Sequence, residues 1–182
     1  MSIIAETSAT QIPAGTWSID PVWSSLEFEV RKLGLIPIKG RVPGFAGTIE
    51  GGDDPSVVGT VDATSITTFD ETRDGHLQSP DFFDTERFPE ITFNSTLVRA
   101  ENNELIVDGE LTIKGTTRPI EARGTITEPA VTFGDVEKIG IELEAIVDRT
   151  EYGLSWNAPL PKGGFALAND VKLIVNLELA RA

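Results

Sequence analysis

The stretch RDGHLQSPDFFD, at residues 73–84, interrupts a chain that otherwise has the pattern of β-strands. Before and after it, apolar and polar residues alternate, which is typical of strands with one buried face. Asp70 and Ser79 are suitable N-caps for two short helical turns in this region. We therefore expect a short helical insertion that brings Phe82 and Phe83 to one end of a barrel, as a plug.

Alternation outside the insertion predicts about eight strands of about ten residues each, joined mostly by short turns. An antiparallel sheet of about eight strands can close into a barrel whose interior holds one ligand. We therefore expect an all-β fold, an eight-stranded antiparallel β-barrel with a short helical insertion. The strands are predicted at about residues 24–31, 40–50, 57–66, 90–99, 105–113, 117–127, 139–148 and 170–180.

The chain of 182 residues has the size of one all-β domain. We expect a flexible N-terminal leader over residues 1–14, which are rich in Ser, Thr and Ala, and one barrel domain over residues 15–182. The 29 acidic and 15 basic residues give a net charge of -14. This charge argues against nucleic-acid partners and against strong adsorption to anionic membranes, because both need basic patches.

The first fifteen residues lack the basic and apolar regions of a secretory signal peptide. No window approaches the roughly 18 apolar residues of a transmembrane helix. An outer-membrane barrel would also alternate, but it would need a secretory signal and two aromatic girdles, and the sequence shows neither. We therefore expect a cytoplasmic protein without stable membrane anchoring, in which the apolar strand faces point inward.

His76 is the only histidine and the first candidate for catalysis. Asp74 and Ser79 lie near it in the sequence, so a base, an orienting carboxylate and a nucleophile are available, and Arg73 is a candidate anion ligand. The alternative is structural: these side chains hydrogen-bond the insertion to the strand ends. A haem bound through His76 is a further alternative. A metal site is not expected, because the chain has one histidine and no cysteine.

Aromatic side chains are the remaining candidates, with nine Phe and three Trp in the chain. In an eight-stranded barrel the inward side chains either fill the interior or line a cavity, and both interpretations are open at this point. A tall, narrow barrel would suit an elongated ligand. The predicted ligand-binding residues are Phe28, Val30, Phe45, Phe69, Leu77, Phe82, Phe83, Phe93, Leu111, Ile113, Trp156 and Phe165.

Six segments carry a further signal: IDPVWSSLEFEVRKLG at 19–34, GFAGTIE at 44–50, RDGHLQSPDFFD at 73–84, FPEITFNST at 88–96, GELTIKGTTRPI at 109–120 and DVKLIVNLELA at 170–180. Together they resemble the YceI-like family. The resemblance implies a lipocalin-like barrel that binds polyisoprenoid chains, such as polyprenyl phosphates or isoprenoid quinones, or other amphiphiles such as fatty amides. It matches His76 to the family's histidine, whereas Trp23 and Lys32 replace histidines of many members.

We therefore predict a binding protein that stores, transports or sequesters a long isoprenoid or other amphiphilic lipid in its barrel, without a cofactor and without an enzymatic reaction. Arg73, Asp74 and His76 are the predicted head-group ligands at the mouth of the barrel. An enzyme acting on an isoprenoid lipid through His76, or a haem- or quinone-linked redox module, is the alternative. Exposed edge strands also allow a homodimer.

Overall fold

The computed structural model describes residues 11–182, so most of the predicted leader lies outside the described residues. Ile12 is nevertheless part of the buried core. Next to it, the carbonyl oxygen of Pro13 accepts a hydrogen bond of 2.8 Å from the indole nitrogen of Trp17. Residues 12 and 13, which fall within the predicted leader, therefore pack against the barrel.

The described chain consists mainly of antiparallel strands, with one α-helix and two short 3-10 helices. No helix of residues 11–182 has both the length and the apolar character to cross a membrane. In chain order the elements are β1 (Gly15–Ile19), β2 (Ser25–Lys32), β3 (Ile36–Arg41), β4 (Phe45–Gly51), β5 (Ser56–Asp62), η1 (Ala63–Ser65), α1 (Glu71–Gln78), β6 (Glu90–Glu101), β7 (Glu104–Ile113), β8 (Thr116–Ile126), β9 (Ala130–Val131), β10 (Glu137–Asp148), η2 (Arg149–Tyr152) and β11 (Leu167–Arg181).

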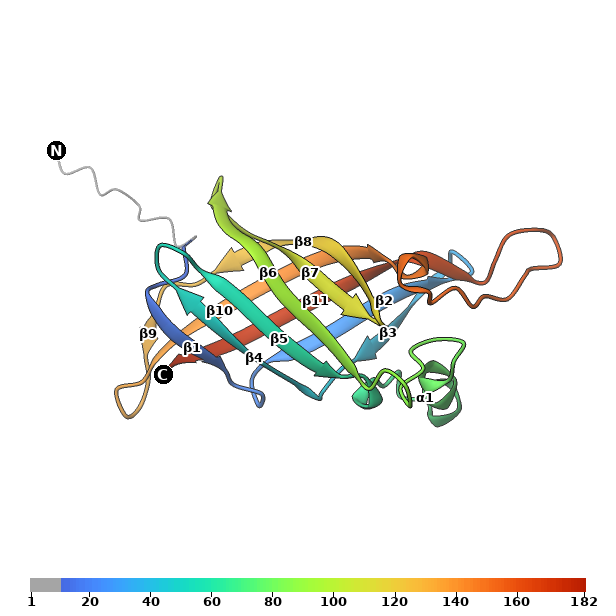
Figure 1. Cartoon of the computed structure of the whole chain (residues 1–182), viewed down its shortest axis with the longest axis horizontal. Helices are drawn as coiled ribbons and strands as arrows, with labels where there is room; N and C mark the ends of the chain where they lie inside the picture. The colour runs from blue at the N-terminus through green and yellow to red at the C-terminus, as the bar shows by residue number, and fades with distance from the viewer. Residues whose placement is uncertain (1–10) are drawn as a thin grey trace.

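The strands form a closed tube, as Figure 1 shows. From β4 to β8 each strand pairs with the next strand along the chain, and β8 pairs with β10. The barrel closes where β10 pairs with β11. The pairing covers almost all of β10, from Lys138 opposite Ala180 to Asp148 opposite Asp170. Closure leaves an unpaired edge only on the short strands β3 and β9 of the described chain, and the predicted eight-stranded antiparallel barrel is confirmed.

Two of the eight barrel strands are interrupted. The long strand β11 pairs with β1 at its end and with β2 nearer its start, on the same edge, so β1 and β2 act as one broken strand. Likewise β3 and β4 act as a second broken strand, because β3 pairs with β2 and β4 pairs with β1. The sequence predicted one continuous strand at 40–50 with a bulge at Pro43. Instead the strand ends at Arg41 and restarts at Phe45, because the proline lacks the N–H that a strand ladder needs.

The alternation that predicted the strands matches their burial. On β10, Ile139, Ile141, Leu143, Ala145 and Val147 are all buried, while the residues between them are more exposed. A period of two places successive side chains on opposite faces of a strand. The apolar faces therefore point into the barrel, as predicted.

The insertion contains the predicted helix, α1, with Asp70 as its N-cap. The Asp70 carboxylate accepts a hydrogen bond of 2.9 Å from the backbone N–H of Arg73, which satisfies one free donor of the first turn. The second predicted helical turn is wrong. Ser79 is the C-cap of α1, where its hydroxyl donates to the carbonyl oxygen of His76, and the residues that follow form turns rather than a helix.

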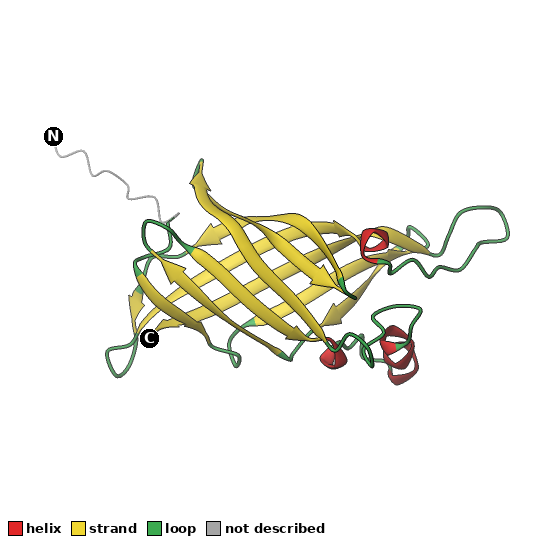
Figure 2. Ribbon diagram, in the orientation of Figure 1, coloured by secondary structure: helices red, strands yellow, loops and turns green. Residues whose placement is uncertain are grey.

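The two ends of the barrel differ. Fully buried side chains, among them Trp17, Ile49, Leu105 and Leu179, fill the end where β1 begins and β11 finishes. The other end carries α1, the turn between β2 and β3, and the segment between η2 and β11; the red helices in Figure 2 all lie there. We call this second end the mouth.

Candidate functional site

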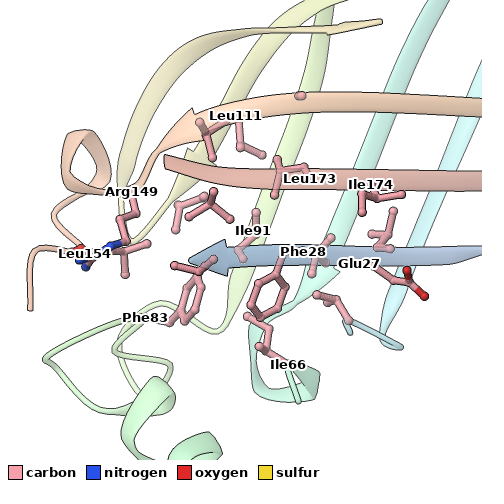
Figure 3. Close-up of a pocket in the computed structure, with 18 of the residues that line it drawn as sticks. Glu27, Phe28, Ile66, Phe83, Ile91, Leu111, Arg149, Leu154, Leu173 and Ile174 are labelled. Atoms are coloured by element: carbon pink, nitrogen blue, oxygen red, sulfur yellow. Dashed lines mark hydrogen bonds between the residues drawn. The ribbon is translucent and has the colours of Figure 1, made fainter. Parts of the chain in front are cut away.

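A cavity of about 820 Å³ occupies the barrel between the filled end and the mouth. Its wall is almost entirely apolar, and every strand except β9 contributes to it. Figure 3 shows Phe28, Ile91 and Leu173 reaching into this space from three strands, with Phe83 of the insertion and Leu154, near Arg149, toward the mouth. The barrel interior is therefore a lined space rather than a packed core at this level.

Two glycines keep the cavity wide. Gly40 lies opposite Phe28 across the β2–β3 pair, and a Cβ added at Gly40 would collide with the Phe28 ring. A Cβ at Gly109 would collide in the same way with the ring of Phe93. Each ring therefore lies against a glycine of the neighbouring strand, where any other residue would push it away. Because each ring lies against a glycine, the cavity wall has an aromatic surface and the centre of the cavity stays open.

An aromatic cluster stands at the mouth. The imidazole of His76 makes edge-on contacts with the rings of Phe82, at a centroid distance of 5.0 Å, and Trp156, at 4.7 Å. The two latter rings are 5.5 Å apart. His76 Nε2 lies 2.9 Å from a carboxylate oxygen of Asp81. All three rings also line the cavity. The fold thus brings His76 and Trp156, which are 80 positions apart in the sequence, into ring contact at the mouth.

Arg73 and Asp74 tie the insertion to the chain that precedes it. Arg73 donates two hydrogen bonds of 2.6 Å to Thr68, one to its hydroxyl and one to its carbonyl oxygen. The Asp74 carboxylate accepts from the Thr67 hydroxyl and from both the hydroxyl and the N–H of Thr68. Burial raises the pKa of Asp74, but these hydrogen bonds outweigh it and the pKa is lowered overall. The carboxylate is therefore engaged in structure and does not line the cavity.

The geometry does not assemble the catalytic group that the sequence allowed. His76 pairs with Asp81 rather than with Asp74, and the Ser79 hydroxyl donates to the His76 main-chain carbonyl oxygen. Across residues 11–182, no hydroxyl is hydrogen-bonded to the His76 ring. The structural alternative describes Asp74 better, whereas Arg73 both binds Thr68 and lines the cavity.

Arg149 is a buried cation at the mouth end of the cavity, and it is 5% exposed. It donates hydrogen bonds to the carbonyl oxygens of Ala168 at 2.9 Å, Leu154 at 2.6 Å and Trp156 at 2.8 Å. Within residues 11–182 its Nη2 atom has no hydrogen-bond partner. Burial lowers the pKa of Arg149, and the neighbouring Asp148 carboxylate opposes this in part. A positive charge with an unused donor therefore lies beside an apolar space.

Tyr152, in the same 3-10 helix, has a second unpaired polar atom. Its hydroxyl is buried without a partner among the described residues. Burial raises the pKa of Tyr152 to about 12, so the phenol keeps its proton at neutral pH.

Most of the predicted ligand-binding residues line the cavity; whether they touch a ligand stays a prediction. Arg73 and His76 line it too. The residues that do so are Phe28, Val30, Phe45, Leu77, Phe82, Phe83, Phe93, Leu111, Ile113 and Trp156.

Two predicted residues lie elsewhere, and those predictions are corrected. Phe69 is largely exposed, in a turn before α1 where its φ of 64° is left-handed, and it lies beside the outer groove at Gly40. Phe165 is also largely exposed, at the base of a protruding loop where it forms a bridge with Pro159. Neither lies on a regular strand, so alternation gave no information about the direction of their side chains.

The sequence analysis missed Arg149 as a site residue. A signal was present: Arg149 follows Val147 by two positions and so continues the inward face of β10. A charge at an inward position is rare, because its burial costs free energy unless hydrogen bonds satisfy it. Many aliphatic wall residues of the later strands, including Leu143, Ala145 and Val171, were not among the predicted ligand-binding residues either.

Comparison with known proteins shows the family to which this barrel belongs. A sequence model of the YceI-like domain matches residues 17–179. The chain belongs to the YceI-like family. A UPF0312 protein of Staphylococcus aureus strain USA300 is 34% identical over 172 residues, which cover 90% of this chain and 96% of that protein.

Solved structures of YceI-like and related proteins share the fold. BcnA of Burkholderia cenocepacia superposes with a TM-score of 0.73 at 19% identity, covering 90% of this chain and 99% of BcnA. The YCEI protein of Campylobacter jejuni gives 0.71 at 24% identity, over 84% and 90% of the two chains. A polyisoprenoid-binding domain of Saccharophagus degradans gives 0.66 at 15% identity, over 91% and 98%. At these identities the likeness concerns the barrel fold.

Proposed function

We propose that this protein binds a long-chain amphiphilic lipid, with a polyisoprenoid as the first candidate, and so stores, transports or sequesters it. The observation that carries the proposal is the apolar cavity of about 820 Å³ inside the closed barrel. Ligand sites are usually concave, mostly apolar spaces of about 300–1,000 Å³ with a few polar groups. This cavity lies at the upper end of that range and has Arg73, His76 and Arg149 at its mouth.

The volume suits a long chain. It is many times the ~30 Å³ that a water molecule occupies in the liquid, so the cavity has room for a chain of many carbon atoms. Burying a methylene group from water contributes about 0.8 kcal/mol. A lipid taken from a bilayer gains little of this, because its tail is already out of water. Selectivity must therefore come from the fit of the chain and from contacts with the head group.

The polar side chains that line the mouth are the candidates for head-group contacts. Of the three predicted head-group ligands, Arg73 and His76 retain this role, whereas Asp74 is occupied by Thr67 and Thr68. Arg149 joins them because it lines the same end of the cavity and carries a positive charge. Two guanidinium groups and an imidazole favour a phosphate, carboxylate or carbonyl oxygen over a cationic head group.

The family supports the class of ligand. The Saccharophagus degradans domain that shares this fold is described as polyisoprenoid-binding. Polyprenyl phosphates and isoprenoid quinones both combine a polyisoprenoid chain with oxygen atoms that accept hydrogen bonds. Fatty amides, which have a smaller head group, are an alternative.

Native mass spectrometry of the purified protein tests the proposal. We expect a mass shift that corresponds to a co-purified lipid, or the uptake of an added polyprenyl phosphate at a ratio of one to one. A protein that takes up neither a polyprenyl phosphate, nor an isoprenoid quinone, nor a long fatty amide would contradict it.

His76 distinguishes binding from the enzymatic alternative. We expect His76→Ala to change the affinity for a polyprenyl phosphate by less than about tenfold, or about 1.4 kcal/mol. The reason is that the His76 side chain is 38% exposed and pairs with the carboxylate of Asp81 at the mouth. Titration of both proteins by fluorescence gives the comparison. Loss of all binding by a folded variant would assign the site to His76 and reopen catalysis.

Phe28 and Phe93 test whether the cavity is empty without its ligand. We expect Phe28→Ala and Phe93→Ala each to cost the delipidated protein less than the 3–5 kcal/mol of a close-packed Phe→Ala, because each ring has a cavity on one side. The lipid-loaded form should lose more, because ligand contacts are lost as well. Urea unfolding with and without lipid measures both. A cost above about 3 kcal/mol that added lipid leaves unchanged would contradict the prediction.

A further inference from the structure

Positive charge is concentrated on one side of the mouth, although the chain has a net charge of -14. Residues 30–42, which include the β2–β3 hairpin, and residues 153–169, which precede and begin β11, contain no acidic residue. Of their five basic residues, Lys39 and Arg41 lie 3.8 and 3.9 Å from carboxylates of β2. The other three form no ion pair with residues 11–182; they are Arg31, Lys32 and Lys162.

The same two segments expose large apolar side chains. Leu35 is 72% exposed, Ile36 is 61% and Phe165 is 64%. The segments are in contact, since the N–H of Leu33 donates a hydrogen bond of 2.7 Å to the carbonyl oxygen of Ala166. We call this combined surface, residues 31–36 and 160–166, the mouth rim. In Figure 1 its longer loop extends beyond the end of the barrel.

The mouth rim is continuous with the cavity. Lys32 of β2 lines the cavity, as do Ala158 and Ala166 on either side of the protruding loop. A lipid chain leaving the cavity at this side would therefore pass from an apolar wall to an exposed apolar surface. That continuity is expected where a protein exchanges a water-insoluble ligand with another apolar phase.

The opposite end of the barrel is acidic. The loops there carry Asp53, Asp54, Glu128 and Asp135, which form no ion pair with residues 11–182; Glu101 and Glu104 flank a further turn and pair with arginines. The 15 residues of β11 separate the two ends, and at ~3.3 Å per residue and a tilt near 40° they span about 35–40 Å along the barrel. This exceeds the Debye length of about 8 Å at physiological salt, so the acidic end hardly repels a surface that touches the mouth rim.

We infer that the mouth rim docks on a bilayer that contains anionic lipid, with the mouth facing the membrane; this rests on the proposed lipid binding. Basic side chains meet the lipid phosphates, and Leu35, Ile36 and Phe165 enter the interface between head groups and acyl chains. The whole-chain charge predicted no strong adsorption to anionic membranes. Its uneven distribution instead allows short-lived docking in one orientation, without stable anchoring.

Vesicle flotation tests the inference with the full chain. The vesicles contain phosphatidylcholine and phosphatidylglycerol at a ratio of seven to three. We expect Leu35→Ser combined with Phe165→Ser to lower the vesicle partition coefficient at least tenfold. The matched control is Val131→Ser combined with Phe133→Ser, an exposed aliphatic and an exposed phenylalanine at the opposite end, and it should leave partition unchanged.

A second readout separates docking from ligand binding. A fluorescent long-chain polyene fatty acid, added from dilute solution, should bind both double variants as it binds the wild type. If the wild type does not bind this fatty acid or any other lipid, the proposed function fails. If it binds the fatty acid but does not float with the vesicles, or floats equally well with the mouth-rim substitutions, only docking is overturned. A dimer that the mouth-rim substitutions dissociate would assign the surface to a second copy of the chain and overturn docking too.

Discussion

Replacing Ala145 by Trp is expected to lower the affinity for a long polyprenyl phosphate by at least about a hundredfold, or about 2.7 kcal/mol. Ala145 is a small, buried wall residue in the last third of β10, toward the mouth. An indole at this position would project across the cavity and take the space that the lipid chain needs. Much of the new side chain would enter empty volume, so the fold should tolerate it better than overpacking of a filled core.

The neighbouring residue supplies the control. Ile146 is 61% exposed on the outer face of the same strand. We expect Ile146→Trp to bind the same lipid as the wild type does, since its side chain points away from the cavity. A graded variant, Ala145→Leu, should still bind shorter chains and guards against a failure of the Trp variant to fold. Equal affinities for the Ala145 and Ile146 variants would show that the lipid does not occupy the barrel.

Replacing Arg149 by Met should lower the free energy of unfolding by about 3 kcal/mol or more. Each buried polar group left without a partner costs about 1–3 kcal/mol. Three carbonyl oxygens, those of Leu154, Trp156 and Ala168, would lose a donor, although the methionine no longer carries a buried charge. The segment after η2 would be released, and Trp156 would leave its contact with His76. Urea unfolding followed by tryptophan fluorescence measures both effects.

The same substitution at the barrel surface is the control. Arg123 forms ion pairs with Glu104 and Glu121 on the outer face, where its side chain is 48% exposed. Exposed pairs of this kind contribute about 0–1 kcal/mol, so Arg123→Met should cost no more than that. A loss below about 1 kcal/mol for Arg149→Met would mean that water satisfies the three carbonyl oxygens as well as the guanidinium does.

The alternation of apolar residues predicted most of the strands and the direction of their faces, but not β3, most of which precedes the predicted strand at 40–50. It works on β10 because a strand period of two is a local property, and because one face of that strand is buried from Ile139 to Val147. The helix α1 was predictable for the same reason, since an N-cap such as Asp70 acts on the adjacent turn. Most of the cavity wall follows from these local patterns.

The mouth was decided only by the tertiary structure. Closure brings β10 against β11. The irregular segment between them places the Trp156 ring beside His76, and the Trp156 carbonyl oxygen accepts a hydrogen bond from Arg149. Irregular segments have no period, so the sequence did not show that Phe69 and Phe165 point outward. Charge shows the same limit: the sequence by itself determined a net charge of -14, but the folded barrel decides which charges share a surface. Pairing between distant segments depends on the closed sheet as a whole, and local patterns do not encode it.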